Sequence, residues 1–497
     1  MEKVFNNPSE LERLVKQKIG FPDFVMMENA ALAIKKLIEQ APFDKRFLSL
    51  SKGREPKRCL ILCGKGNNGG DGYALARLLG NTTQTFLYML AEPTAPEAKK
   101  QYEMCRKLKF PFLTDKKLLE FLSKPCDNLF IIDCLFGTGF KGELSPQVTK
   151  ILKAANNAKA IRIACDIPSG LAFNADYTVT MGEHKLALFS DKAKQTAGQI
   201  IVADLGVDPE LFQNQAKPAA FLVTADDMRL PIRTNKAAHK GTYGHTAVFA
   251  GEKSGAAIIC ATAAMNFGSG LTTLIPKEKS NLEQFKISPE LMISKTLPKK
   301  TSCVVLGPGI QNFLEQEFED LAKWFNSAST IHPGVVFDAG VFDNPLFPKT
   351  LKALDSRPDA RIVLTPHLLE LVRLCKSLKI KPEPTVDELA NDPELKIKLG
   401  QKINKMFPNT VLVIKSANTF ISACGQTYII TDGCPSLAKG GSGDVLAGMI
   451  AALLSQNYSA KDAAITACQA HALAAKKIGA TSYSLTPMKL INAISKL

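Results

Sequence analysis

The chain has 497 residues, of which 45% are hydrophobic and 22% are charged, and its formal net charge is +15. This balance is typical of a folded globular protein and excludes a disordered or fibrous chain, while the length favours two domains. The lysines are scattered, without an arginine-rich tail or a zinc-finger spacing, so we expect a solvated basic surface or anionic small-molecule ligands rather than a nucleic-acid partner.

The cysteine pattern and the apolar runs indicate the compartment. Most of the 12 cysteines lie within apolar, strand-like runs and no CxxC pair occurs, which predicts buried thiols in a reducing environment. The 6 histidines are too dispersed to predict a zinc site. The first residues lack the apolar stretch of a secretory leader, and no apolar run is long enough to cross a bilayer. We therefore expect a cytoplasmic protein that does not bind a membrane.

Both halves of the chain repeat one pattern, in which a short apolar run is followed by a turn and then by helical periodicity. Such alternation predicts α/β domains with parallel sheets covered by helices. The periodicity lapses before a new strand begins in the middle of the chain, so we expect one domain over residues 1–225 and another over residues 226–497. The predicted strands lie within residues 58–64, 83–90, 129–137 and 158–170, and within residues 245–252, 271–276, 302–309, 334–340, 361–367 and 409–419.

The first polar loop, GKGNNGGDG at residues 64–72, follows the first of these strands. Gly64, Gly66 and Gly69 have the spacing of a dinucleotide-binding turn. We expect their backbone to approach an anion, and a helix that begins around Gly72 to offer its free N–H groups to a phosphate. A second glycine loop, at residues 137–142, follows the third strand. Because ligands of parallel sheets bind beyond the carboxyl ends of the strands, the two loops predict one crevice for a ligand that carries a pyrophosphate.

Side chains with oxygen atoms follow the same strands. Asp133 and Asp166 come at the ends of apolar runs, where a carboxylate is partly desolvated. Together with Asn68 and Ser169, they have the chemistry of an all-oxygen site for a hard cation. The alternative is that each side chain serves local structure alone, the two aspartates and Ser169 as caps and Asn68 as a turn former.

An NAD-dependent dehydrogenase of the Rossmann type is a second interpretation of the first half. Glu92 lies about twenty residues beyond the glycines, where the ribose-binding acid of that fold is found. However, no hydride-transfer dyad is evident along the rest of the chain. The polar residues Asn67, Asn68 and Asp71 are also not needed beside a pyrophosphate that glycine alone can hold.

In the second half, a glycine-rich turn at residues 438–444 leads directly into an apolar helix. The N–H groups of Gly441, Ser442 and Gly443 predict an anion hole at the start of that helix. Asp444 is placed to take a proton from a hydroxyl that attacks a phosphate, or else it is only a favourable charge at the helix start. No GxxxxGK[ST] segment occurs, which excludes a P-loop. His367, after the strand at 361–367, is compatible with either a ligand-binding or a structural role.

The motifs MENAA, GNNGGDGYALARLL, DCLFGTGF, DIPSGL, GPGI, VLTPH, VLVIKSANT and GGSGDVLAG occur in this order and resemble those of the bifunctional NAD(P)H-hydrate repair family. The resemblance spans nearly the whole chain. It implies two three-layer α/β/α domains. The N-terminal domain, Rossmann-like, would interconvert the R and S hydrates of NADH and NADPH (NADHX and NADPHX). The C-terminal domain, ribokinase-like, would dehydrate the S form with ADP as co-substrate. Members of the family commonly form homo-oligomers.

The resemblance also implies roles for particular residues. Asp133 would transfer a proton during epimerisation or only bind an ion, and Asp444 would be the base of the dehydration. K⁺ would lie on Asn68, Asp133 and Ser169, and Mg²⁺ on the phosphates of the nucleotide. The residues implied to bind the hydrated substrate are Asn67, Asn68, Gly69, Gly70, Asp71, Gly137, Thr138, Gly139, Phe140, Lys141, Gly142, Glu143, Asp166, Ala257, Gly309, His367 and Asp444. Those implied to bind ADP are Lys415, Ser416, Ala417, Asn418, Thr419 and Gly443.

A few positions depart from the family pattern. Residues 338–342, DAGVF, stand where Asp-Ala-Asp is usual, Ser416 stands where glycine is common, and the usual Pro-Gly is missing after His367. Because these changes spare Asp133 and Asp444, we expect both activities, with ADP or ATP as the phosphate donor left open. A sugar or vitamin kinase, and a binding protein that has lost catalysis, remain as rival interpretations.

Overall fold

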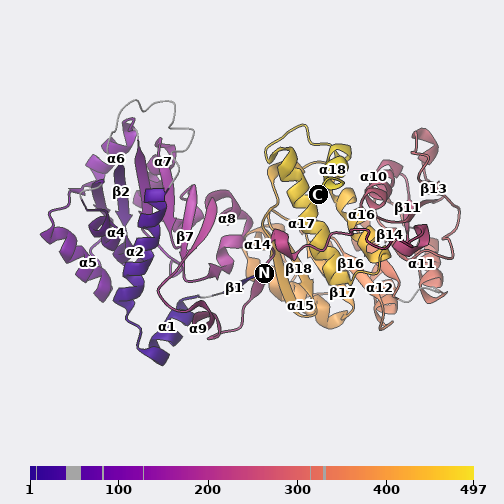
Figure 1. Cartoon of the computed structure of the whole chain (residues 1–497), viewed down its shortest axis with the longest axis horizontal. Coiled ribbons are helices and arrows are strands. Elements are labelled where there is room, and N and C mark those ends of the chain that lie inside the picture. The colour runs from indigo at the N-terminus through magenta and orange to yellow at the C-terminus, as the bar shows by residue number, and fades with distance from the viewer. Residues whose placement is uncertain (7, 41–56, 81–82, 127, 314, 328–331) are drawn as a thin grey trace. The chain divides into compact units, whose positions relative to one another are not determined.

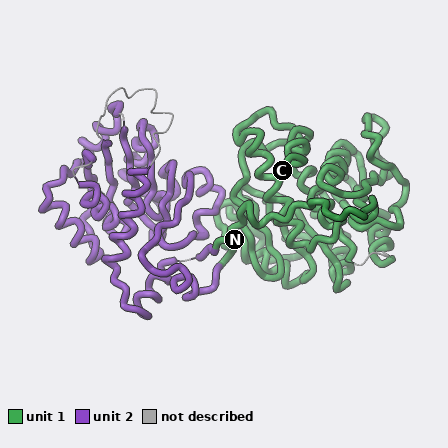
Figure 2. Tube along the Cα trace, viewed as in Figure 1, with its two compact units in different colours: residues 1–2, 219–497 green, residues 3–218 purple. Residues whose placement is uncertain are grey.

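The computed structural model describes residues 1–497 except residues 7, 41–56, 81–82, 127, 314 and 328–331. Within this part the chain forms two compact units (Figure 2): unit 2 is Lys3–Pro218, and unit 1 is Met1–Glu2 together with Ala219–Leu497. Both units are α/β structures built on largely parallel sheets, which confirms the predicted fold class. The boundary between residues 225 and 226 stays a prediction. Among the described helices, none is long and apolar enough to cross a membrane.

Unit 2 contains, among its described residues, a seven-stranded sheet in the order β4-β3-β2-β5-β6-β7-β9 (Figure 1). All neighbouring strands are parallel. Because parallel neighbours need a crossover connection, helices follow most of the strands. The strands are β2 (Arg58–Cys63), β3 (Gln84–Met89), β4 (Phe112–Leu113), β5 (Leu129–Cys134), β6 (Ile161–Cys165), β7 (Tyr177–Met181) and β9 (Gln199–Ala203). A short parallel pair, β1 (Glu2–Phe5) and β8 (His184–Lys185), lies outside this sheet.

Helices cover both faces of the sheet of unit 2. Successive residues of a strand point to opposite faces, and Leu60 and Ile61 of β2 accordingly belong to two separate cores. The core with Ile61 includes residues of α1 (Pro8–Ile19), α2 (Asp23–Gln40), α4 (Asn67–Leu79) and α5 (Pro96–Lys107). The core with Leu60 includes residues of α6 (Asp115–Ser123) and α7 (Pro146–Asn157). The remaining helical segments are the 3₁₀ turns η2 (Ser169–Leu171) and η3 (Leu186–Phe189) and the helices α8 (Asp191–Thr196) and α9 (Pro209–Gln213).

Unit 1 has a sheet in the order β13-β12-β11-β14-β15-β16-β17-β18-β19-β10. Its neighbours are parallel except that β18 is antiparallel to both β17 and β19. The strands are β10 (Ala220–Leu222), β11 (His245–Ala250), β12 (Leu271–Pro276), β13 (Met292–Ile293), β14 (Cys303–Leu306), β15 (Gly334–Phe337), β16 (Arg361–Leu364), β17 (Thr410–Ile414), β18 (Thr419–Ala423) and β19 (Gln426–Ile430).

One face of this sheet packs against the apolar helices α10 (Ser254–Asn266), α16 (Ser442–Ser455), α17 (Ala460–Gly479) and α18 (Pro487–Ile494). Val336 of β15 belongs to this core, and its neighbour Phe337 points to the opposite face, where its ring meets Phe347 of α12 (Phe347–Asp355). The other helices are α11 (Glu315–Ser327), α13 (Leu368–Ser377), α14 (Val386–Asn391) and α15 (Pro393–Met406), and the 3₁₀ turns are η4 (Ala225–Asp227), η5 (Lys240–Tyr243), η6 (Leu282–Gln284), η7 (Ala339–Asp343) and η8 (Pro435–Leu437).

Candidate functional sites in the two units

In unit 2, the first glycine loop joins β2 to α4. The helix begins at Asn67, so the prediction that it starts around Gly72 is wrong. The glycines explain the difference, because a Cβ on Gly64 would overlap the carbonyl oxygen of Leu135 and a Cβ on Gly69 would overlap that of Gly64. These two glycines let the first turn of the helix pack tightly against the strand ends. The free N–H groups of that turn therefore belong to the NNGGD segment itself.

The buried carboxylate at the end of β5 is held by the loop that follows β6. Asp133 is 0% exposed. Its Oδ2 accepts the backbone N–H of Ser169 at 2.8 Å, and its Oδ1 accepts the Ser169 hydroxyl at 2.7 Å and the N–H of Leu135 at 3.2 Å. Burial raises the pKa of Asp133 to about 6, although the bonds from Ser169 favour the ionised form. The carboxylate is therefore poised to exchange a proton near neutral pH.

The second glycine loop brings Asn68 and Asp166 to the same edge of the sheet. A Cβ on Gly137 would lie 2.8 Å from Oδ2 of Asp166 and 3.7 Å from Cγ of Asn68. The same Asp166 oxygen accepts the N–H of Thr138 at 3.1 Å. Both polar atoms of the Asn68 side chain are buried and have no hydrogen-bond partner among the residues that the structure describes. The three loops thus converge as expected from the adjacency of β2, β5 and β6.

In unit 1, the glycine-rich turn leads into α16 with Gly441 in the left-handed conformation, at φ +90°. The side chain of Lys415, which follows β17, reaches this helix start. Its Nζ lies 2.7 Å from Oδ1 of Asp338 and 3.9 Å from Oε2 of Glu370, and a Cβ on Gly443 would be 3.4 Å from it. Burial lowers the pKa of Lys415, but the charges of Asp338 and Glu370 outweigh it and the net shift is upward. A fixed cation therefore stands beside the start of α16, which suits a phosphate. Of the three N–H groups predicted to form the anion hole, that of Ser442 is not free, because it donates to the carbonyl oxygen of Lys439 at 3.1 Å.

Asp444 occupies the first turn of the same helix. Burial raises its pKa to about 7, and the charge of Asp338 adds to this rise, whereas Lys415 opposes it. A carboxylate with this pKa is half ionised at neutral pH and is able to act as a general base there. The fold thus brings the Asp444 carboxylate and the Lys415 cation to the same helix start.

His367 caps the start of α13. Its Nδ1 accepts the backbone N–H of Glu370 at 3.3 Å, and the backbone N–H of His367 donates to Oε2 of Glu370 at 2.8 Å. Because Nδ1 is an acceptor, the neutral imidazole carries its proton on Nε2, which lies 3.2 Å from Oε1 of Glu370. The imidazole is half exposed, and a parallel bridge joins His367 to Lys415. The histidine is therefore both a helix cap and a neighbour of Lys415.

Two family descriptions and several curated proteins match the chain. The NAD(P)H-hydrate dehydratase family matches residues 246–496, and the family described as YjeF-related protein N-terminus matches residues 23–187. The bifunctional NAD(P)H-hydrate repair enzyme of Helicobacter pylori is 35% identical, and the match covers 100% of both chains. That of Moorella thermoacetica is 30% identical over 94% of this chain and 90% of that protein.

This chain belongs to the bifunctional NAD(P)H-hydrate repair enzyme family. A solved structure from Bacillus subtilis, described as an ADP/ATP-dependent NAD(P)H-hydrate dehydratase co-crystallised with ATP and Mg²⁺, is 24% identical and covers 53% of this chain and 92% of that one, with a TM-score of 0.42.

Not every residue that the resemblance to the repair family implied is open to a ligand. Ala257 is fully buried in α10, so its side chain offers no surface. Gly309, at φ +71°, packs its backbone against the carbonyl of Lys253 at the start of the same helix. In the segment implied to bind ADP, Ala417 is exposed, whereas the Asn418 side chain is 1% exposed. The roles of these residues stay predictions.

Two buried lysines that the sequence did not single out contact the predicted sites. Lys185 of β8 forms an ion pair with Asp166, and Lys396 of α15 donates to Oγ of Ser416 at 2.9 Å. Both lysines are at most 2% exposed. A lysine within an amphipathic helix or a two-residue strand gives no local signal of burial, so only the tertiary structure reveals these contacts.

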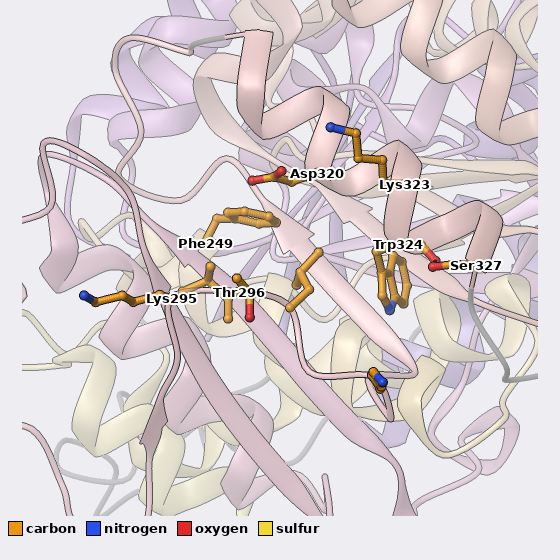
Figure 3. A pocket seen from close by; sticks show the side chains of 10 residues that line it. Phe249, Lys295, Thr296, Asp320, Lys323, Trp324 and Ser327 are labelled. Carbon is orange, nitrogen blue, oxygen red and sulfur yellow. The ribbon is translucent and has the colours of Figure 1, made fainter.

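A separate cavity of about 400 Å³ lies in unit 1 between β12, the segment that follows β13, and α11 (Figure 3). Trp324 and Phe249 line it together with Lys295 and Lys323, while Asp320, also at its wall, is paired with Lys277. The residues implied to bind the hydrate or ADP are not among the ten that line it. The cavity is therefore distinct from the dehydratase residues of this repair enzyme.

Proposed function

We propose that this chain repairs hydrated NADH and NADPH, with epimerisation of the R and S hydrates in unit 2 and ADP-dependent dehydration of the S hydrate in unit 1. The observation that carries the proposal is the start of α16, where Asp444 stands beside the Lys415 cation. A base and a cation at an anion-binding helix end are what a phosphoryl transfer to a hydroxyl requires. Membership of the repair family and the names of the two bacterial relatives support the same conclusion.

In unit 1, Lys415 and the first N–H groups of α16 would bind the terminal phosphate of ADP. Asp444 would accept the proton of the ring hydroxyl, whose oxygen then attacks the terminal phosphorus while the bond to the AMP oxygen breaks. In the resulting ester, phosphate is a better leaving group than hydroxide. Cleavage of its carbon–oxygen bond, with loss of a proton from the neighbouring ring carbon, restores the dihydronicotinamide. The products are NADH or NADPH, AMP and inorganic phosphate.

The remaining nucleotide contacts are part of the same proposal. The segment Lys415–Thr419 and Gly443 would hold ADP, and Gly309 and His367 would face the hydrate. Among the described residues, no group of three or more His, Cys, Asp or Glu side chains is arranged to hold a metal ion. Mg²⁺ would therefore arrive on the phosphates of the nucleotide, where it would neutralise the charge that develops in the transfer.

In unit 2, Asp133 would exchange the proton that epimerisation moves, and the loops around Asn67–Asp71, Gly137–Glu143 and Asp166 would bind the dinucleotide. The donor set fits K⁺, because Asn68 Oδ1 is a buried oxygen without a hydrogen-bond partner in the described part of the chain, and the Asp133 carboxylate and the Ser169 hydroxyl also offer oxygen ligands. When bound there, K⁺ would supply positive charge next to Asp133. Assembly into a homo-oligomer and a cytoplasmic location belong to the proposal as well.

The test uses the full chain with a mixture of R and S hydrates, ADP, Mg²⁺ and K⁺, under conditions in which spontaneous epimerisation is slow. The absorbance of the reduced nicotinamide should recover from both epimers. Asp444→Asn should stop the recovery entirely, whereas Asp133→Asn should leave the R epimer unrepaired. If the unaltered protein restores no absorbance with either ADP or ATP, the proposed dehydration is wrong. If Asp133→Asn repairs both epimers at the normal rate, Asp133 has no role in epimerisation.

A further inference from the structure

Lys185 is a cation buried in the interior of unit 2. It is the last residue of β8, and its side chain is 2% exposed. A lysine is almost never fully buried unless a partner compensates its charge, because the desolvated ammonium costs several kcal/mol by order of magnitude. The partner here is Asp166, whose Oδ1 forms an ion pair with Nζ of Lys185. Lys185 thus lies directly behind a residue of the proposed epimerase crevice.

The other side of the Asp166 carboxylate faces the second glycine loop. Its Oδ2 accepts the N–H of Thr138 at 3.1 Å, and a Cβ on Gly137 would lie only 2.8 Å from it. The backbone of Asp166 has φ +73°, a conformation that is uncommon for residues other than glycine. Asp166 is therefore clamped between the buried ammonium and the loop, in a backbone conformation that such clamping stabilises.

Further ionisable groups surround Lys185. Glu12 of α1, Asp71 of α4 and the Cys165 thiol of β6 interact electrostatically with it. Burial raises the pKa of Glu12 and raises that of Asp71 well above its usual value. Burial also lowers the pKa of Lys185 to about 8, although these acidic groups oppose the shift. The ammonium is therefore present at neutral pH and loses its proton in mildly alkaline solution.

We propose that Lys185 is a positioning residue of the epimerase site, whose ammonium fixes and neutralises the Asp166 carboxylate so that this carboxylate can bind the hydrated dinucleotide. The dinucleotide carries negative phosphates, and an uncompensated carboxylate in the same crevice would repel them. With one oxygen held by Lys185, the other stays aligned with the Gly137–Glu143 loop. This inference rests on the proposed epimerase function of unit 2.

The test measures epimerisation of the pure R hydrate by the full chain in the absence of ADP, with the two epimers separated by chromatography. Lys185→Met should lower kcat/KM for epimerisation about 10- to 100-fold, as loss of a supporting partner commonly does. Lys150→Met, which removes an exposed lysine of α7, should have no effect and is the matched control. The dehydration of the pure S hydrate with ADP, measured on the same preparations, should be unchanged and reports that unit 1 remains intact.

A double mutant distinguishes positioning from a general loss of structure. If Lys185 acts through Asp166, then Lys185→Met combined with Asp166→Asn should be no slower than Asp166→Asn alone. The loss in Lys185→Met should also lie in KM rather than in kcat, because Asp166 is proposed to bind the dinucleotide. A smaller folded fraction would instead lower the apparent kcat and leave KM unchanged.

The possible results separate the two hypotheses. No epimerisation by the unaltered protein, with dehydration intact, would overturn the proposed function of unit 2 and this inference with it. Normal epimerisation by Lys185→Met, additive losses in the double mutant, or a loss confined to kcat would overturn the role of Lys185 alone.

Discussion

The carboxylate of Asp444 should give the dehydration a pH dependence that an ordinary aspartate would not. Burial and the charge of Asp338 raise the pKa of Asp444 to about 7. Since a general base must be ionised, kcat/KM for the S hydrate should rise with pH. The ionised fraction grows from about one tenth at about pH 6 to about nine tenths at about pH 8, which predicts a roughly nine-fold increase. A carboxylate with an unperturbed pKa would be ionised throughout this range, and the rate would be flat.

Asp338→Asn tests the cause of this shift. Removing the negative charge of Asp338 favours ionisation of Asp444, so the midpoint of the profile should move to lower pH by about one unit. Asp343→Asn is the matched control, because Asp343 is an exposed aspartate that pairs with Arg373. Initial rates of absorbance recovery at low concentrations of the pure S hydrate and saturating ADP, from about pH 5 to about pH 9, measure both effects. A flat profile would exclude Asp444 as the titrating base. A midpoint that moves upward in Asp338→Asn would exclude the charge of Asp338 as a cause of the raised pKa of Asp444.

Three further changes have defined outcomes. Gly64→Ala should lower the free energy of unfolding of unit 2 by about 3 kcal/mol, because the new Cβ would overlap a backbone carbonyl. A Cβ on Gly66 would meet nothing within 4 Å, so Gly66→Ala should lower this free energy far less. Chemical denaturation of the two variants measures the difference. Ser169→Ala removes a hydrogen bond to the ionised Asp133, so the pH profile of epimerisation should shift upward by about one unit, and an unchanged profile would argue against proton exchange by Asp133. Lys396→Met should raise KM for ADP about ten-fold by freeing the segment implied to bind ADP, and an unchanged KM would exclude this support.

The fold class could be predicted from the sequence because apolar runs and turns are local features of the chain. Apolar runs such as residues 58–63 and 129–134 are followed by glycine-containing turns and then by helical periodicity, and this alternation predicts parallel strands with functional loops at their carboxyl ends. The start of α4 was misplaced because glycines usually argue against a helix. In this chain Gly64 and Gly69 permit close backbone packing, and the helix begins at Asn67. Tertiary packing thus overrode a local propensity.

The candidate sites were predictable only in part. Asp133 lies at the end of β5 and Ser169 follows the adjacent strand β6, so the sequence predicts that they meet, and the structure joins them by two hydrogen bonds. The ion pair of Lys415 with Asp338 spans 77 positions along the chain, and no periodicity reports such a contact. The burial of Lys185 likewise depends on tertiary contacts that the sequence pattern does not indicate. Lysine usually lies at the surface, and only the packed structure shows which lysines are held inside.

The fate of the oxygen atom of the ring hydroxyl distinguishes phosphoryl transfer from direct loss of water. If Asp444 activates this hydroxyl for attack on the terminal phosphate of ADP, a heavy-oxygen label placed in the hydroxyl of the S hydrate should appear in the inorganic phosphate released by the full chain. Mass spectrometry of the phosphate measures the transfer, and Asp444→Asn should release no labelled phosphate. Recovery of reduced nicotinamide with all of the label in water would exclude attack of this hydroxyl on the phosphate.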